Sequence, residues 1–433
     1  MINFASSFHR IINKTLSPKF ESILFGSLML AGAVISFLTR NLLNSLPYQL
    51  GEETIGIFTA AFFTAIFFTA VGYYNRFTKK LFLKSMLLFI FQLAPYGEIL
   101  FKEIKPNPKE DFDRYVDYAH NMIENKTLWG GDKLHYKKEG YSYITQPGIR
   151  YITALQLLLF KTLYRLISVL NVLFFLCALF LFLKTLHENI QQKELSFLLL
   201  LQFLLTVPYA VKNILMGIPE WFTLILLMFS VFFYVTRKNA WIAVFLLALV
   251  PFFRQNILPA VLVLLFLFLY HHKHKWKLLL LFAAVLLLPV YHNLYYAGEL
   301  KFFTSIFQWP FLQYENHQSR SPNGFFFIRI INNMLHYFGF DWIRLKSIDF
   351  IEESFAFLWL FCFLFVYSGR FLQNNQKRFF FYVVSVFIII IPQILLATDF
   401  YPRFEFVNIF LIFSFFITLC TIKSPSEFLK IKT

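Results

Sequence analysis

Long apolar segments, separated by short clusters of Lys and Arg, are the feature that most constrains the fold of this chain. Hydrophobic residues make up 58% of its 433 residues, and only 15% of the residues are charged. Several apolar segments reach the roughly 20 residues that a helix needs to cross a bilayer. A segment inside lipid must satisfy its backbone hydrogen bonds internally, which favours helices. The sequence therefore predicts an all-α fold, a polytopic transmembrane helix bundle.

The apolar segments predict about 12 spans in a single integral membrane domain that covers residues 1–433. Ten of them are centred on residues 22–43, 55–74, 81–101, 166–183, 195–211, 218–235, 278–296, 354–368, 379–396 and 404–422. The other two come from residues 240–270, a run that is too long for one ordinary span. Arg254 interrupts this run between Pro251 and Pro259. We therefore expect two short helices here, with Arg254 near the outer surface.

Lys and Arg cluster at the ends of alternate segments, as they do in cytoplasmic loops. Clear examples are the N-terminal Arg10, Lys14 and Lys19 and the run His271–Lys277. This placement accounts for the net charge of +16, so we expect no nucleic-acid partner. It predicts an integral membrane protein with both termini cytoplasmic, in contact with membrane lipids. The composition suits a bacterial inner (plasma) membrane.

The same topology leaves two long polar segments on the outer face, residues 102–150 and 297–353. The first predicts a helix that starts near Asn107, a residue type that caps helices, with Pro108 at the first helical position. The helix would be amphipathic. Its apolar face would carry Phe112, Val116, Ala119 and Ile123, and its polar face Asp113, Asp117, His120 and Glu124. The second segment predicts an interfacial helix over residues 325–337.

Three polar groups are the best candidates for catalysis or substrate binding: the carboxylates of Asp111 and Asp113 and the guanidinium group of Arg254. Carboxylates in a first helical turn are favoured by the helix dipole with no further role. They could also act as a general base toward an acceptor hydroxyl, or hold a divalent cation through oxygen ligands. The sequence leaves the cofactor and any metal open. Arg254 could extend to lipid headgroups or bind an anionic substrate group.

Two common catalytic classes are excluded by missing motifs. No Gly-x-x-x-x-Gly-Lys phosphate loop occurs in the sequence, so the chain is not its own ATPase. The Gly-x-Ser-x-Gly elbow of the α/β-hydrolases does not occur either.

Four short stretches resemble one family of membrane enzymes. They are Asp113-Arg-Tyr-Val-Asp-Tyr-Ala119, Gln146-Pro-Gly-Ile-Arg-Tyr151, Phe253-Arg-Gln-Asn-Ile-Leu-Pro259 and Tyr401-Pro-Arg-Phe404. In these stretches and in the order of spans and loops, the chain resembles the multi-span glycosyltransferases of the C superfamily. That group includes bacterial mannosyl- and aminoarabinosyl-type transferases.

The resemblance implies an enzyme that takes a sugar from a polyprenyl-phosphate donor at the outer membrane face and passes it to a lipid or glycan acceptor. It makes Asp113 the candidate catalytic base, with Asp111 as the alternative. Tyr115 falls in the same motif as a substrate-binding candidate. Arg254 and Arg403 would face the donor phosphate.

Two other functions remain open. An envelope polysaccharide polymerase or ligase would depend on His317 and Arg320 in the second outer segment more than on an aspartate in the first. A transporter or flippase of lipid-linked sugars would carry charges at mid-bilayer depth and related sequence halves. In the sequence nearly all charges lie at predicted interfaces, which favours the glycosyltransferase.

Overall fold

The computed structural model describes part of the chain, and this part is helical throughout its regular elements. The described residues are 17–43, 52–74, 78–93, 111–128, 147–161, 163–189, 210–211, 214, 220–236, 239–254, 257–270, 272–297 and 376–396. Among them there is no strand. The all-α prediction is confirmed over these ranges.

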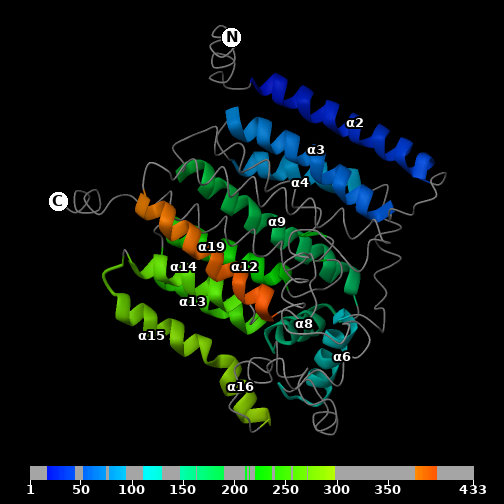
Figure 1. Cartoon of the computed structure of the whole chain (residues 1–433). Helices are drawn as coiled ribbons and strands as arrows, with labels where there is room; N and C mark the ends of the chain where they lie inside the picture. The colour runs from blue at the N-terminus through cyan, green and yellow to red at the C-terminus, as the bar shows by residue number, and fades with distance from the viewer. Residues whose placement is uncertain are drawn as a thin grey trace, which may run out of the picture. The chain divides into compact units, whose positions relative to one another are not determined.

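Twelve helices carry the described chain (Figure 1). In chain order they are α2 (Pro18–Leu43), α3 (Glu52–Tyr74), α4 (Lys79–Leu93), α6 (Asp111–Glu124), α8 (Pro147–Phe160), α9 (Tyr164–Asn189), α12 (Glu220–Val235), α13 (Ala240–Phe253), α14 (Leu258–Tyr270), α15 (Lys275–Leu286), α16 (Leu288–Ala297) and α19 (Gln376–Leu396).

Three described stretches are long and apolar enough to cross a membrane. They are Pro18–Ile35, Leu166–Thr185 and Lys275–His292. Six shorter apolar helical segments of 10–17 residues accompany them in the described ranges. The membrane character predicted from the apolar segments therefore holds for the folded chain. The predicted spans at residues 354–368 and 404–422 lie outside the described residues, as does most of the span at 195–211.

The chain divides into two compact units. One comprises Met1–Phe112 with Leu163–Ile218, and the other comprises Asp113–Thr162 with Pro219–Thr433. In the first unit, α2, α3 and α4 lie side by side (Figure 1). Alanines at buried positions of α3, such as Ala60 and Ala61, let neighbouring helices approach closely. The helix α9 joins them through Phe180, whose ring lies 4.5 Å from that of Phe82 and 5.9 Å from that of Phe68.

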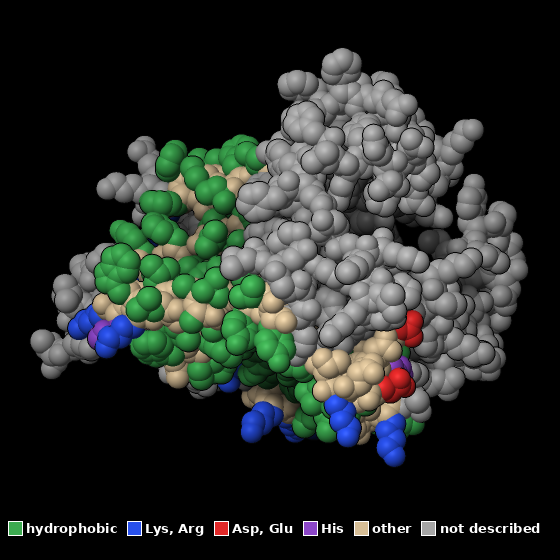
Figure 2. All heavy atoms as spheres, turned by 90° about the horizontal axis from the view of Figure 1, so that it is seen from below, with side chains coloured by type: hydrophobic (Ala, Val, Ile, Leu, Met, Phe, Trp, Pro, Cys, Tyr) green, Lys and Arg blue, Asp and Glu red, His purple; other side chains and the backbone are tan. Residues whose placement is uncertain are grey.

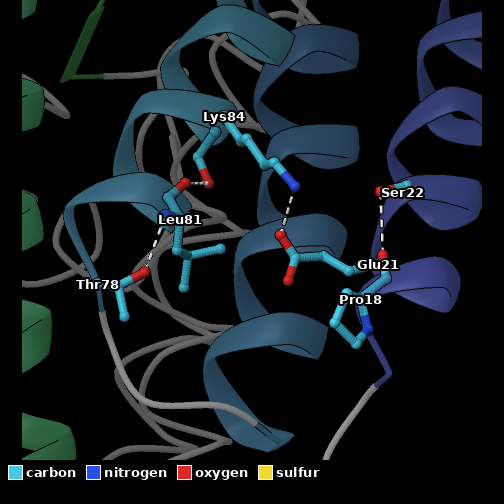
Figure 3. Close-up of polar contacts among 7 residues, drawn as sticks. Pro18, Glu21, Ser22, Thr78, Leu81 and Lys84 are labelled. Carbon is cyan, nitrogen blue, oxygen red and sulfur yellow. Dashed lines mark hydrogen bonds and ion pairs between the residues drawn. The ribbon is translucent and has the colours of Figure 1, made fainter.

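Two polar contacts fasten α2 to α4. Lys84 Nζ lies 2.6 Å from Glu21 Oε1, and Figure 3 shows Lys84 reaching from α4 toward the first turn of α2. A carboxylate there is favoured by the helix dipole as well as by the lysine. Farther along, Gln92 Nε2 donates to the carbonyl oxygen of Leu28 at 3.0 Å. Between helices that are otherwise apolar, these contacts define which faces pair.

The second unit is built around α13, which packs against α8, α12, α14 and α15. The α12–α13 pair is close because Ser230, a small residue, meets Ala243: the Ser230 hydroxyl donates to the Ala243 carbonyl oxygen at 2.8 Å. Asn239 starts α13 by accepting from the backbone N–H groups of Trp241 and Ile242. One turn further along α12, the ring of Tyr234 stacks on that of Phe268 in α14, with 3.9 Å between the ring centroids.

The break in the run at residues 240–270 is confirmed, because α13 ends and α14 begins on either side of Arg254. The expected span at 278–296 largely coincides with the apolar stretch Lys275–His292, which is long enough to cross a membrane. It consists of α15 and α16, which meet at Leu287, since Pro289 has no N–H to continue the ladder of the preceding helix. Residues 151–160 belong to a separate helix, α8, which ends at Lys161 with a positive φ of 52°.

The contact between α2 and α4 gives a stability prediction. A Cβ added at Gly32 would lie 2.6 Å from Cδ of Gln92 and 3.0 Å from its Cγ. Gln92 is buried and its amide is hydrogen-bonded to Leu28, so it does not simply swing aside. We expect Gly32→Ala to lower the free energy of unfolding by about 1–3 kcal/mol, measured by unfolding in detergent micelles.

Gly26 in the same helix is the matched control, because a Cβ there meets nothing within 4 Å. Gly26→Ala should be neutral or slightly stabilising, since alanine favours a helix over glycine by about 0.5–1 kcal/mol. Equal losses in both variants would contradict the packing of Gln92 against Gly32.

Candidate functional site

A buried ion pair joins the start of α12 to the end of α13. Arg254 Nη2 donates to Glu220 Oε1, and the two side chains are only 10% and 2% exposed. Because α12 and α13 form a hairpin, the first residue of α12 lies beside the residue that follows α13. Each charge also suits its helix end, since acids are favoured at N-termini and cations at C-termini.

Prolines explain why the chain leaves the helix at Arg254. Pro251 lies in the last turn of α13 and lacks the N–H that would bond one turn back. Arg254 then adopts an extended backbone, with φ −145° and ψ 100°, while its N–H still reaches the Val250 carbonyl oxygen at 3.0 Å. Pro259 falls in the first turn of α14, where proline is tolerated.

The N-terminus of α8 packs directly against the end of α13. A Cβ at Gly148 would lie 2.8 Å from Phe252 Cδ1 and 3.0 Å from both the Phe252 carbonyl oxygen and Phe253 Cδ1. Only glycine fits that approach, because one of the obstructing atoms belongs to the backbone. This contact places the first turn of α8 against Phe252 and Phe253, the two residues that precede Arg254 in the chain.

Arg150 and Tyr151 extend this contact in two directions. Arg150 is 2% exposed, and its Cζ lies 4.8 Å from the ring centroid of Tyr118, which ties α8 to α6. Tyr151 packs on Phe252 with 5.5 Å between ring centroids, and its hydroxyl is hydrogen-bonded to Nδ1 of His292 in α16. The four helices α6, α8, α13 and α16 thus bring polar groups to one region of the second unit.

This region contains two buried guanidinium groups as well as a phenol–imidazole pair. Arg150 and Arg254 supply the guanidinium groups, and Arg254 is paired with the Glu220 carboxylate. Guanidinium groups bind phosphate and carboxylate oxygens in paired hydrogen bonds. Phenol and imidazole groups, as in Tyr151 and His292, can pass protons.

Some of the site residues predicted from the sequence lie in the part of the chain that the structure describes, and others lie outside it. Arg254 is buried and paired with Glu220, and its role in binding an anionic substrate group stays a prediction. Asp111 is the first residue of α6 and Asp113 lies in the same first turn. Tyr115 follows on α6 and is half-buried. Arg403, His317 and Arg320 lie outside the described residues, as does the predicted cap Asn107.

No metal centre is evident over the described ranges: they hold no group of three or more His, Cys, Asp or Glu side chains that could bind a metal ion. The carboxylates at the start of α6 were the sequence candidates for a divalent cation. Metal binding there remains a prediction.

Sequence reasoning did not assign a role to Arg150, Tyr118, Tyr151 or His292. A usable signal existed for His292. His292 is the last residue of a helical stripe whose members alternate in spacing between four and three residues. All five members are buried: Leu278, Phe282, Val285, Pro289 and His292. A histidine that continues an apolar stripe faces the protein interior rather than lipid.

Comparisons with protein-family models, with curated proteins and with solved structures find no match to this chain.

Removing one charge of the Glu220–Arg254 pair should be strongly destabilising. Arg254→Met leaves the Glu220 carboxylate buried without its cation, and such changes cost about 3–5 kcal/mol. We expect the double variant Glu220→Leu/Arg254→Met to recover most of this loss, because no uncompensated charge remains. Unfolding of the wild type, Glu220→Leu, Arg254→Met and the double variant in detergent micelles gives the coupling energy directly.

The exposed pair Lys184–Glu188, 3.8 Å apart, provides the control. Lys184→Met should change stability by less than about 1 kcal/mol. A double variant as unstable as Arg254→Met alone would show that the pair is not the source of the loss.

Proposed function

We propose that this protein is a membrane glycosyltransferase that moves a sugar from a polyprenyl-phosphate donor to a lipid or glycan acceptor of the cell envelope. The observation that carries the proposal is the pair of buried arginines, Arg150 and Arg254, in the unit that also contains residues 113–124 of the acidic helix α6. The contact of Arg150 with Tyr118 on α6, and that of Gly148 with the residues before Arg254, supply the connection.

In the proposed reaction the acceptor hydroxyl gives its proton to the carboxylate of Asp113, or of Asp111. Its oxygen attacks the anomeric carbon of the donor sugar. The bond from that carbon to the phosphate oxygen breaks, and polyprenyl phosphate leaves with the negative charge. Arg254 and Arg403 face that phosphate, where charge-assisted hydrogen bonds strengthen as the charge grows. Tyr115 contributes to substrate binding beside the base.

The topology that belongs to this proposal has about 12 spans, with both termini in the cytoplasm of a bacterial cell and the site on the outer side of its inner membrane. It is supported by the charge at the two ends of α14. The end near Arg254 carries the buried ion pair, and the other end carries the exposed Lys273, Lys275 and Lys277. Exposed lysines are typical of the cytoplasmic end of a span.

Asp113→Asn tests the proposal. The variant keeps the size and hydrogen-bonding capacity of the side chain but removes the base, so sugar transfer from a labelled polyprenyl-phosphate donor should fall by about 10²–10⁴-fold. Transfer is measured with protein reconstituted in vesicles. Retained helical content and a monodisperse elution profile would show that the variant still folds.

Asp117→Asn is the matched control, because Asp117 is exposed on the same helix and lies one turn on. It should keep nearly full activity. Transfer by Asp113→Asn at the wild-type rate, with Asp111→Asn equally active, would end the assignment.

A transporter or flippase of lipid-linked sugars is the second candidate, and the buried Glu220–Arg254 pair favours it specifically. Charges enclosed among apolar helices commonly mark a substrate path. The two functions separate in vesicles that contain the lipid-linked sugar on one leaflet. A flippase delivers the sugar to a lectin on the other side without acceptor, and Asp113→Asn leaves that delivery intact.

The envelope polymerase or ligase alternative depends on His317 and Arg320. Substitution of either by Ala should leave single-sugar transfer unchanged if the glycosyltransferase proposal holds. Loss of activity in both variants, with Asp113→Asn active, would move the function to that class.

A further inference from the structure

The turn between α14 and α15 is closed by its own hydrogen bonds. The backbone N–H of His272 donates to the Leu269 carbonyl oxygen at 3.1 Å, and that of Leu278 donates to the His274 carbonyl oxygen at 3.2 Å. Between them, the N–H of His274 donates to Nδ1 of the His272 ring at 3.1 Å. These contacts connect the end of α14 with residues 272–278.

The neutral form of His272 fits this arrangement, because only an unprotonated Nδ1 can accept the bond. Partial burial lowers the pKa of His272 below the usual histidine value, and the neighbouring His274 lowers it further. The hydrogen bond to Nδ1 is therefore compatible with neutral pH.

The side chains that this turn presents are basic and aromatic. Lys273, His274, Lys275 and Lys277 are exposed, and Trp276 between them is 78% exposed. The ammonium group of Lys275 lies 5.9 Å from the ring centroid of Tyr270, which is itself exposed. Three lysines thus surround two aromatic rings at one helix junction.

An apolar helix surface continues directly from this turn. Leu279, Leu280, Leu287 and Leu288 are exposed on α15 and α16. Figure 2 shows hydrophobic side chains over a broad area of one face, with Lys, Arg and His side chains at its edge.

A second aromatic pair ends this surface. Tyr291 and Tyr295 on α16 are 68% and 72% exposed. At 1.5 Å per residue, Trp276 and these tyrosines are at most about 22–28 Å apart along α15 and α16, close to the hydrocarbon thickness of a bilayer. Aromatic side chains at both ends of an apolar surface are typical of a helix surface in contact with lipid.

We propose that the α14–α15 turn is a binding site for the headgroups of anionic phospholipids. Lys273, Lys275 and Lys277 contact the lipid phosphates, and Trp276 and Tyr270 insert at the headgroup level. The occupant is the bilayer itself, because the basic turn is continuous with the exposed apolar surface of α15. Lysines beside a bilayer attract anionic lipids. Aromatic residues fix how deeply the helix end lies in the headgroup layer.

The test compares lipid selectivity in wild-type and variant proteins. Protein is reconstituted in phosphatidylcholine vesicles, and the protein-associated fraction of spin-labelled phosphatidylglycerol is measured against that of spin-labelled phosphatidylcholine. The wild type should prefer phosphatidylglycerol severalfold, and the variant Lys273→Gln/Lys275→Gln/Lys277→Gln should lose at least about half of this preference. The charge-conserving Lys→Arg triple variant should retain it.

The matched control removes three lysines elsewhere, Lys79, Lys80 and Lys184, by substitution with Gln. An equal loss of selectivity in this control would overturn the proposal, since net charge alone would then explain the preference. Displacement of the labelled lipid by inorganic phosphate at low millimolar concentration would also overturn it, by making the site one for a free anion.

A second measurement uses only the wild-type chain and therefore does not depend on how the variants fold. A phosphatidylglycerol probe with a photoreactive headgroup is activated in the vesicles, and the modified peptides are identified. Labels on residues 270–280 are expected, and they should decrease at high salt because ions screen the lysines. Labelling confined to other segments would refute the site.

Discussion

The ion pair between Glu220 and Arg254 is the interaction on which the second unit depends. Two charges among apolar helices are stable only because each compensates the other. The pair fixes the start of α12 against the end of α13, and α13 in turn contacts α8, α12, α14 and α15. The same arginine marks the point where the chain leaves one helix and begins the next.

The close approach of Gly148 to Phe252 and Phe253 connects this arrangement to α8. It brings a helix from the first polar segment of the sequence to the end of a helix from the middle of the chain. Arg150 then carries the connection on to Tyr118 in α6. An acidic helix and a buried cation, more than a hundred residues apart in the sequence, are linked by two consecutive packing contacts.

The elements that depend on local patterns were predictable from the sequence. Apolar length predicted the helices, and the position of Arg254 between two prolines predicted the break between α13 and α14. The division of α15 from α16 follows from Pro289 by the same rule, but the continuous apolar composition hid it. Helix α6 was expected from its amphipathic spacing, although its predicted start lies outside the described residues.

The composition of the site was less predictable, because its partners come from tertiary packing. Glu220 and Arg254 are each ordinary residues at a span end, and nothing in either segment indicates that they pair. In the sequence, Arg150 is one basic residue before an apolar helix. Its burial against Tyr118 is visible only in the folded structure. The hydrogen bond between Tyr151 and His292 joins residues 141 positions apart, beyond the reach of any periodic pattern.

The shortness of α13 and α14 has a consequence for the membrane around them. With 14 and 13 residues, these helices extend only about 20 Å, whereas the hydrocarbon layer measures about 30 Å. The α15–α16 surface, with aromatic rings at both ends, matches the full layer. If the lysine-bearing ends share one headgroup plane, Arg254 lies about 10 Å beneath the opposite one. A bilayer accommodates such hydrophobic mismatch by local thinning, by flanking side chains that extend to the headgroups, or by association of the short helices with other chains.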